Sequence, residues 1–321
     1  MLASLIGLIV FVLVCRAVLW CVRTFWQWLG KGRPVRGAEE CAALSEESRE
    51  AVRTLEAVRA ANRLDGSPLR LSREQLRLLN RAERAVRDDY IDHLSIGWYQ
   101  VVMIFFIGSM AGLVLEEVWM FATMGLTESR VGLVWGPFSP LYGVGAVLLT
   151  LVSFQLRRHH ASLLVAFLVS MAIGGLLEQG TGWAMETFMG AVSWDYIAGG
   201  VPGAITRWVA VPFLFFWGLL GICWYRLVMP SLLWWLGTPT TRRKVVFVGL
   251  LAAYLAADIF MTAACFERRA ERLAGVPARG PFERWVDTHY SDEFMAERFQ
   301  NMVITGAGDM ATQLGAGKKA T

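Results

Sequence analysis

Four carboxylates beside apolar segments are the side chains of this 321-residue sequence best suited to chemistry. Glu116 and Glu178 lie toward the ends of two long apolar stretches, and the segment after the second stretch adds Glu186 and Asp195. A charged group at the centre of a membrane span costs roughly 2.5–3.5 kcal/mol, so a carboxylate there is a functional-site hypothesis by default. We predict that these groups bind a cationic part of a substrate. The alternative is that they are interfacial carboxylates satisfied by an arginine or by water.

Aromatic and basic residues from the connecting segments complete the predicted site. In the triplet Trp194-Asp195-Tyr196 a carboxylate lies between two rings that favour the membrane interface, and Arg207 is a candidate partner for Asp195. Tyr142 and Trp194 are predicted walls and cation–π partners. No catalytic residue and no metal ligand is assigned. The predicted substrate-binding residues are Glu116, Glu178, Glu186, Asp195, Trp194, Tyr142, Ser139, Arg130 and Arg207.

The stretch from Gly132 to Gly145, GLVWGPFSPLYGVG, interrupts the apolar pattern between two predicted spans. Its two prolines remove backbone donors at a depth where every donor must be paired. Irregular backbone survives there only where protein or a water-filled cavity receives it. We therefore predict that the stretch lines a site.

Helical spacing predicts the orientation of two neighbouring carboxylates, and one more carboxylate lies in the last apolar segment. Glu116 follows Gly108 and Gly112 at intervals of four residues, so it shares the close-packing face of its helix and points into the bundle. Glu117 is rotated by about 100° and is expected at the surface. Asp258, deep in the last apolar segment, is a proton or ion relay or, equally, the acceptor of a hydrogen bond between helices.

Composition requires a membrane protein. Hydrophobic residues make up 55% of the chain and the mean hydropathy is +0.44, too apolar for a soluble domain of this length. The net charge of +4 is small and its basic residues fall in a few segments, which indicates topology signals rather than a nucleic-acid surface. The five cysteines form no CxxC pair and suggest neither a disulfide framework nor a zinc site.

The apolar segments predict an all-α protein with about six membrane spans. The predicted spans are an N-terminal anchor within residues 1–30 and the ranges 98–120, 135–154, 162–183, 208–227 and 245–265. Residues 31–96 are expected to form a cytoplasmic helical hairpin, residues 97–265 the membrane bundle and residues 266–321 a C-terminal tail whose last residues look flexible.

The positive-inside rule places the N-terminus and the predicted site outside the cell. The basic group Lys31, Arg33 and Arg36 follows the anchor, and later basic connections also fall on the cytoplasmic side. The rule conflicts with Arg268, Arg269 and Arg272, which a sixth span leaves outside. Either the rule fails there, or residues 232–236 contain a re-entrant piece.

A tandem parallel repeat is suggested by two sequence matches. SMAGLVLE, from Ser109 to Glu116, resembles SMAIGGLLE, from Ser170 to Glu178, with one insertion. The spacing from Pro137-Phe138 to Gly143 recurs from Pro212-Phe213 to Gly218. The offset between the halves is 62 (178 − 116) for the first match and 75 (212 − 137) for the second. Coincidence of small residues in apolar helices is the alternative.

These residues also carry a resemblance to a known family. Gly132 to Gly145, followed by Glu178, Glu186 and Trp194-Asp195-Tyr196, resembles the "Putative ABC-transporter type IV" membrane-protein family (CmpB-like), with its GP-x-x-P-x-YG stretch, Glu-bearing helix and WDY motif. The resemblance covers residues 98–230. Val131 stands where that family has an arginine, and Ile197 where it has a serine. The resemblance implies a transporter permease.

The leading hypothesis is a permease-like membrane component of a transport system, with its substrate site near the outer face. Because no GxxxxGK[ST] motif occurs, a separate ATPase subunit would dock at the cytoplasmic hairpin. The other expected partners are the lipid bilayer and further copies of the chain, with no cofactor and no nucleic acid, in a bacterial cytoplasmic membrane. The alternatives are an intramembrane enzyme that uses Glu178 or Glu186 as a base on a lipid-linked or envelope substrate, and a non-catalytic assembly or sensor protein.

Overall fold

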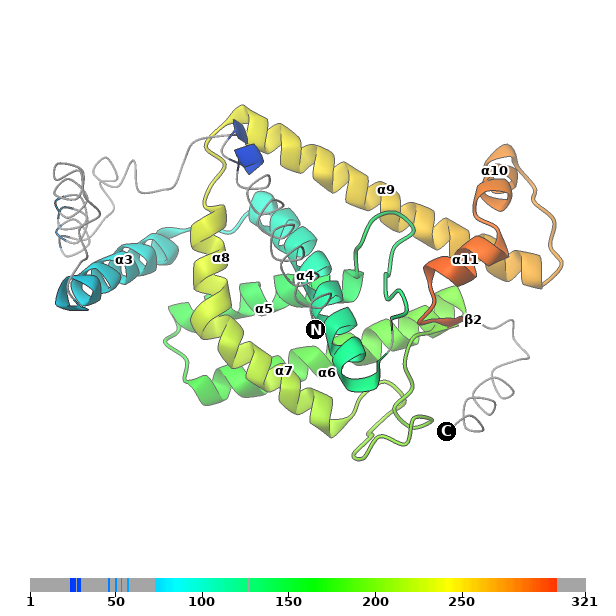
Figure 1. Cartoon of the computed structure of the whole chain (residues 1–321), viewed down its shortest axis with the longest axis horizontal. Coiled ribbons are helices and arrows are strands. Elements are labelled where there is room, and N and C mark those ends of the chain that lie inside the picture. Colours follow the sequence, from blue (N-terminus) through cyan, green and yellow to red (C-terminus); the bar gives the residue numbers. More distant parts are fainter. Residues whose placement is uncertain are drawn as a thin grey trace, which may run out of the picture. The chain divides into compact units, whose positions relative to one another are not determined.

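The computed structural model describes residues 24–26, 28, 29, 46, 50, 53, 57, 73–125 and 127–304. This part of the chain is helical apart from its connections and one two-stranded sheet, which confirms the all-α prediction (Figure 1). Most of the predicted N-terminal anchor and most of the first arm of the predicted hairpin lie outside the described residues. The chain divides into two compact units: Met1–Gln100 with Pro230–Leu250, and Val101–Met229 with Leu251–Thr321.

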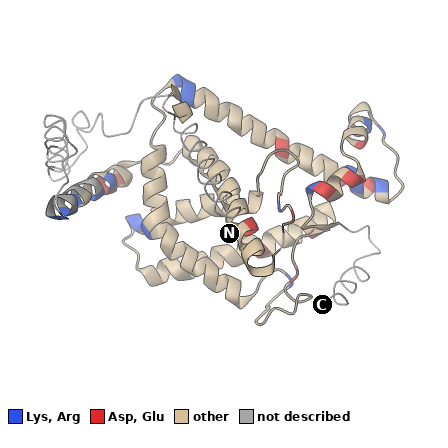
Figure 2. Cartoon of the chain, in the orientation of Figure 1, with Lys and Arg blue, Asp and Glu red and all other residues tan. Residues whose placement is uncertain are grey.

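Five helical segments of the described chain are long and apolar enough to cross a membrane. They are α4 (Trp98–Met124), α5 (Pro140–Arg158), α6 (Leu163–Met189), the continuous segment Val211–Leu236, and α9 (Arg242–Leu273). Large apolar side chains such as Leu115, Leu176 and Phe260 remain exposed on them, as expected of surfaces that face lipid. Charges are sparse along the spans (Figure 2). Three of them lie well inside a span: Asp258 in α9, Glu178 in α6 and Arg226 in the segment Val211–Leu236. The protein is therefore a polytopic membrane protein.

The segment Val211–Leu236 is one helix with a π-helical turn in its middle. It consists of α7 (Val211–Cys223), the π-helix η2 (Trp224–Val228) and α8 (Met229–Leu236), and the Met229 N–H donates to the Trp224 carbonyl. Pro230 cannot donate, and its ring would collide with the preceding turn of a regular helix, so the wider π turn accommodates it. The suggestion of a re-entrant piece at residues 232–236 is wrong, because these residues continue the helix.

The first unit contains α3 (Arg73–His93) and both ends of the connection between α8 and α9. The ring of Tyr90 on α3 packs edge-on against Trp234 of α8, with centroids 5.3 Å apart. The side-chain amide of Gln100 donates to the Gly237 carbonyl at 2.8 Å and so caps the end of α8. The second arm of the predicted hairpin is thus a helix that packs on a span, whereas the domain boundaries stay predictions.

The second unit has one end built by three segments, hereafter the loop face. The segments are residues 125–139 (the first loop), 190–210 (the second loop), and 274–304, which contains α10 (Pro281–His289) and α11 (Asp292–Arg298) beside the end of α9 (Figure 1). Strand β1 (Ala191–Val192) pairs antiparallel with β2 (Val303–Ile304), and the Ser129 N–H donates to Gln300 at 2.8 Å. Part of the segment predicted as the C-terminal tail therefore joins the two loops.

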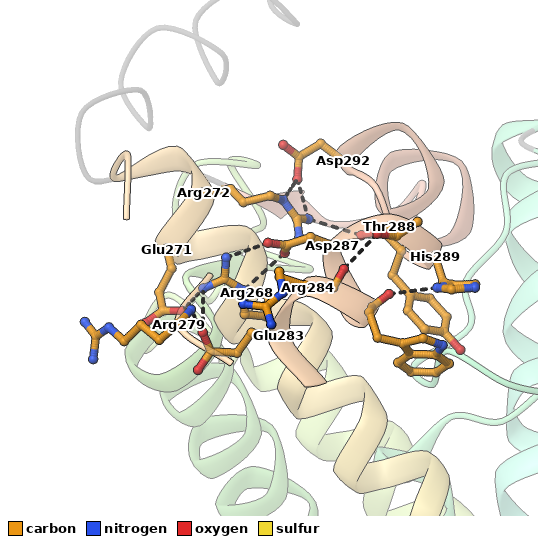
Figure 3. A network of polar contacts seen from close by, with 12 residues as sticks. Arg268, Glu271, Arg272, Arg279, Glu283, Arg284, Asp287, Thr288, His289 and Asp292 are labelled. Carbon is orange, nitrogen blue, oxygen red and sulfur yellow. Dashed lines mark hydrogen bonds and ion pairs between the residues drawn. The ribbon is translucent and has the colours of Figure 1, made fainter. Parts of the chain in front are cut away.

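The end of α9 is fixed to α10 and α11 by ion pairs (Figure 3). Arg268, with only 4% of its side chain exposed, pairs with Asp287 at 2.7 Å and also contacts Glu271. Arg272 pairs with Asp287 at 2.6 Å and with Asp292 at 2.7 Å. These ion pairs fix Arg268 and Arg272 at the loop face. The positive-inside rule counts basic residues rather than net charge, so the topology stays a prediction.

Candidate functional site

Helices α4 and α5 pack through small residues on both sides. A Cβ added at Gly112 would overlap the ring of Tyr142, and one added at Gly108 would overlap the Ala146 methyl group. A Cβ at Gly143 would lie 2.8 Å from the ring of Phe105. The glycines are therefore required for the close approach of the two helices, as predicted for the face that includes Glu116.

Helices α6 and α7 also pack through small residues. A Cβ added at Gly174 would overlap the indole of Trp217, and one added at Gly221 would overlap the side chain of Ser170. A Cβ at Gly218 would lie 2.5 Å from the ring of Phe167. A Cβ at Gly145 of α5 would lie 3.2 Å from the same Trp217 indole, which is thus wedged between α6 and α5.

These contacts are equivalent, residue by residue, between the two helix pairs. Each residue of α4 corresponds to the α6 residue 62 positions later (178 − 116), and each residue of α5 to the α7 residue 75 positions later (212 − 137). The contact Gly112–Tyr142 becomes Gly174–Trp217, and the contact Gly108–Ala146 becomes Ser170–Gly221. The sequence alignment with one inserted residue is therefore wrong. Ser170 corresponds to Gly108 rather than to Ser109, and no insertion is needed. The repeated unit is a glycine-packed helix pair with a carboxylate beside an aromatic ring.

In the first pair the carboxylate is neutralised. The side chain of Tyr142 is hydrogen-bonded to Glu116, and Arg130 from the first loop donates to Glu116 at 2.8 Å. Arg130 also pairs with Glu128 at 3.1 Å and keeps only 13% of its side chain exposed. Glu116 is thus a member of a closed ion-pair group.

In the second pair the carboxylate has one hydrogen-bond partner among the described residues. Trp217 takes the position of Tyr142 and donates its indole N–H to Glu178 Oε1 at 2.9 Å. Glu178 is 7% exposed, and its Oε2 is buried with no hydrogen-bond partner among the described residues. The sequence alternative, in which an arginine satisfies Glu178, is not what the described chain shows. Helix α6 continues to Met189, whereas the predicted span ended at residue 183. Glu178 therefore lies farther from the helix end than predicted.

The second loop closes on itself through Arg207. Its guanidinium donates to Asp195 at 2.8 Å and to Glu186 of α6 at 2.7 Å. Burial tends to raise the pKa of Asp195, but hydrogen bonds from the Ala198 N–H and from Arg207 outweigh it and place that pKa below its usual value. The predicted pair of Asp195 and Arg207 is present, and Glu186 joins it.

Tyr196 is the residue of the second loop that links the two halves. Its ring stacks on Phe213 of α7 with centroids 4.6 Å apart, while the neighbouring Trp194 donates to the Trp208 carbonyl at 3.2 Å. Burial, then the negative charges of Glu178 and Glu116, raise the pKa of Tyr196. The structure therefore brings both carboxylates of the repeat within electrostatic range of one tyrosine, which the sequence prediction left out of the site.

The Gly132 to Gly145 stretch is irregular as predicted, but protein receives its backbone. Residues 132–139 are not helical, and α5 begins at Pro140 rather than at Trp135. The N–H groups of Val134 and Trp135 donate to Thr262 and Asp258 of α9, at 2.9 and 2.8 Å. Ser139 is buried, and its N–H donates to the Ser109 carbonyl at 3.3 Å.

Arg298 of α11 completes this packing. It donates to the Leu133 carbonyl at 3.0 Å and also to the Gly136 carbonyl. Burial lowers the pKa of Arg298, although Asp258 and Tyr254 act in the opposite direction. With two donors received by α9 and two acceptors by α11, protein receives the backbone of the stretch, and its role as a site lining stays a prediction. Asp258 thus accepts a hydrogen bond from the first loop rather than from another helix, and its Oδ2 has no hydrogen-bond partner among the described residues. The relay role of Asp258 stays a prediction. The Ser291 N-cap with Asp292 and Glu293 is a sequence signal that could have predicted α11.

Comparison with known families decides the identity of the chain. The family model "Putative ABC-transporter type IV" matches residues 103–263. The chain belongs to this family. Comparisons with curated proteins and with solved structures returned no match. The match in this ABC-transporter type IV protein includes α4 to α8, both halves of the repeat and most of α9, and it extends beyond residue 230, where the resemblance read from the sequence ended.

Proposed function

We propose that this protein is the permease-like membrane component of a transport system, with a substrate site at the loop face around Glu178. The observation that carries the proposal is the difference between the two halves. Glu116, Glu186 and Asp195 each have an arginine partner, whereas the buried Oε2 of Glu178 has no hydrogen-bond partner in the described part of the chain. Family membership adds the transport context.

The substrate chemistry follows from the surroundings of Glu178. A carboxylate with an indole donor on one oxygen can use the other oxygen for a cationic group. Tyr196 and Trp217 supply aromatic faces, which favour a cation. Since Oε2 is buried, substrate entry requires the segments around it to move, and the Arg207 pairs hold the neighbouring second loop in place. In this proposal Arg130, Glu116, Tyr142 and Ser139 position the first half rather than touch the substrate.

ATP hydrolysis is assigned to a separate subunit. In the proposal this subunit docks on the predicted cytoplasmic hairpin of residues 31–96, which includes α3, and the loop face lies on the outer side of a bacterial cytoplasmic membrane. The mixed charges of α3 suit a contact with a soluble partner (Figure 2).

The test is purification of the full chain from its native membrane, followed by mass spectrometry and an ATPase assay in liposomes. We expect a copurifying ATPase whose transport-linked activity is lost with Glu178→Gln and kept with Glu117→Gln, a control on α4. Turnover of a substrate by the chain alone would instead favour the intramembrane enzyme. Normal transport after substitution of Glu116, Glu178 and Asp195 together would leave these carboxylates a structural role in an assembly or sensor protein.

A further inference from the structure

Glu178 lies in a place that excludes most ligands in the arrangement described. Its Oε2 is buried against protein, and in the described chain Glu178 forms no ion pair. The α7 helix presents the Trp217 N–H to Oε1 and no titratable group to Oε2. A ligand that occupies Oε2 without movement of the surrounding segments must therefore be very small.

The charged and titratable groups around Glu178 do not stabilise a negative charge on it. Tyr196 of the second loop lies within electrostatic range of both Glu178 and Glu116, and Tyr142 of α5 lies within range of Glu116 and Tyr196. Glu116 is itself acidic, and its arginine, Arg130, is already shared with Glu128. An isolated ionised carboxylate in an apolar interior is so costly that such a group takes up a proton instead.

The equivalent position in the other half gives the comparison. Both carboxylates accept from an aromatic residue in the second helix of their pair, Tyr142 or Trp217. Among the described residues only the first half adds an arginine, so the same backbone geometry holds one carboxylate that is paired with an arginine and one that is not. The geometry points to a proton-binding site: we propose that Glu178 carries a proton on Oε2, and that a cationic substrate binds by displacing it. The displacement step rests on the proposed function, whereas the proton itself does not.

In this scheme the exchange is balanced. The O–H bond of the Glu178 carboxylic acid breaks, the proton leaves through the loop face, and the carboxylate that remains neutralises the incoming cation. One positive charge leaves for each one that enters, so the buried site never holds an unpaired carboxylate. Movement of the segments around Oε2 would admit both species.

Infrared spectroscopy of the full-length protein in liposomes at neutral pH tests the proton directly. The C=O stretch of a protonated, deuterium-sensitive carboxylic acid is expected in the wild type, lost in Glu178→Gln and kept in Glu116→Gln. Trp217→Phe, which keeps the acid and removes its indole donor, should shift the band without abolishing it, and this variant is the check if Glu178→Gln does not fold. Identical spectra for the wild type and folded Glu178→Gln, or an unshifted band in Trp217→Phe, would overturn the proposal. The measurement needs neither substrate nor ATPase, so its failure is distinct from failure of the transport function.

Discussion

The substitution Gly174→Ala probes the repeated helix pair where it is tightest. The added methyl group would overlap the rigid indole of Trp217, which Gly145 of α5 holds from the other side. Overpacking of this kind costs about 1–3 kcal/mol, and displacement of the indole from Glu178 adds about 0.5–1.5 kcal/mol for a neutral hydrogen bond. Removal of a helical glycine returns about 0.5–1 kcal/mol. The expected net loss of unfolding free energy is about 2 kcal/mol.

The matched control is Gly180→Ala on the same helix. Gly180 is exposed, and a Cβ there would meet nothing within 4 Å, so this variant should be as stable as the wild type or slightly more stable. Equilibrium unfolding in mixed detergent micelles, followed by circular dichroism, gives both values. If the repeat is real, Gly112→Ala should resemble Gly174→Ala, because its methyl group would overlap Tyr142. Equal stability of Gly174→Ala and Gly180→Ala would refute the packing argument.

Three further predictions concern the loop face. Arg298→Ala should lower the unfolding free energy by about 1–3 kcal/mol, because two part-buried loop carbonyls lose their donor; a neutral result in the same unfolding assay would contradict the role of α11. The guanidinium of Arg268 holds the pKa of Asp287 below its usual 3.8, so their ion pair stabilises the fold above about pH 4 and this stabilisation is lost as the pH falls through the folded-state pKa. Asp287→Asn should therefore flatten the pH dependence of the unfolding free energy in acid. An unchanged slope would contradict the role of this pair. In a variant without native cysteines, Ser193→Cys and Ser291→Cys should react with an impermeant maleimide from the same side of the membrane. Labelling from opposite sides would contradict the assignment of both segments to one loop face.

The sequence predicted the elements well where apolar length or a local break decides them. The five described spans follow from hydropathy, and the prolines of Gly132 to Gly145 mark an irregular segment that the structure confirms. Their exact ends were harder to predict. Residues 135–139 are apolar enough for a span. However, the N–H groups of Val134 and Trp135 donate to side chains of α9, and α5 begins only at Pro140.

The contacts that define the site depend on residues too far apart for pattern reasoning. Arg298 reaches Leu133 across 165 positions, and nothing near either residue indicates the other. The repeat was visible in the sequence as two similar short segments, but its register came from packing. The sequence match paired the two serines, Ser109 and Ser170, whereas the contacts pair Gly108 with Ser170, which are both small enough for the same helix crossing. Residue type identified Glu116 and Glu178 equally, and only the structure separates the compensated acid from the open one.

The central claim is that the two halves share one geometry but differ in charge compensation, and two matched variants test it most directly. The unfolding free energies of Glu116→Gln and Glu178→Gln at neutral pH should differ clearly. Glu116→Gln removes the charged acceptor of Arg130 and should cost about 1.5–3 kcal/mol. Glu178→Gln keeps an acceptor for Trp217 and replaces an acid that has no counter-ion in the described chain, so it should cost less than about 1 kcal/mol. Equal losses in the two variants would contradict the account.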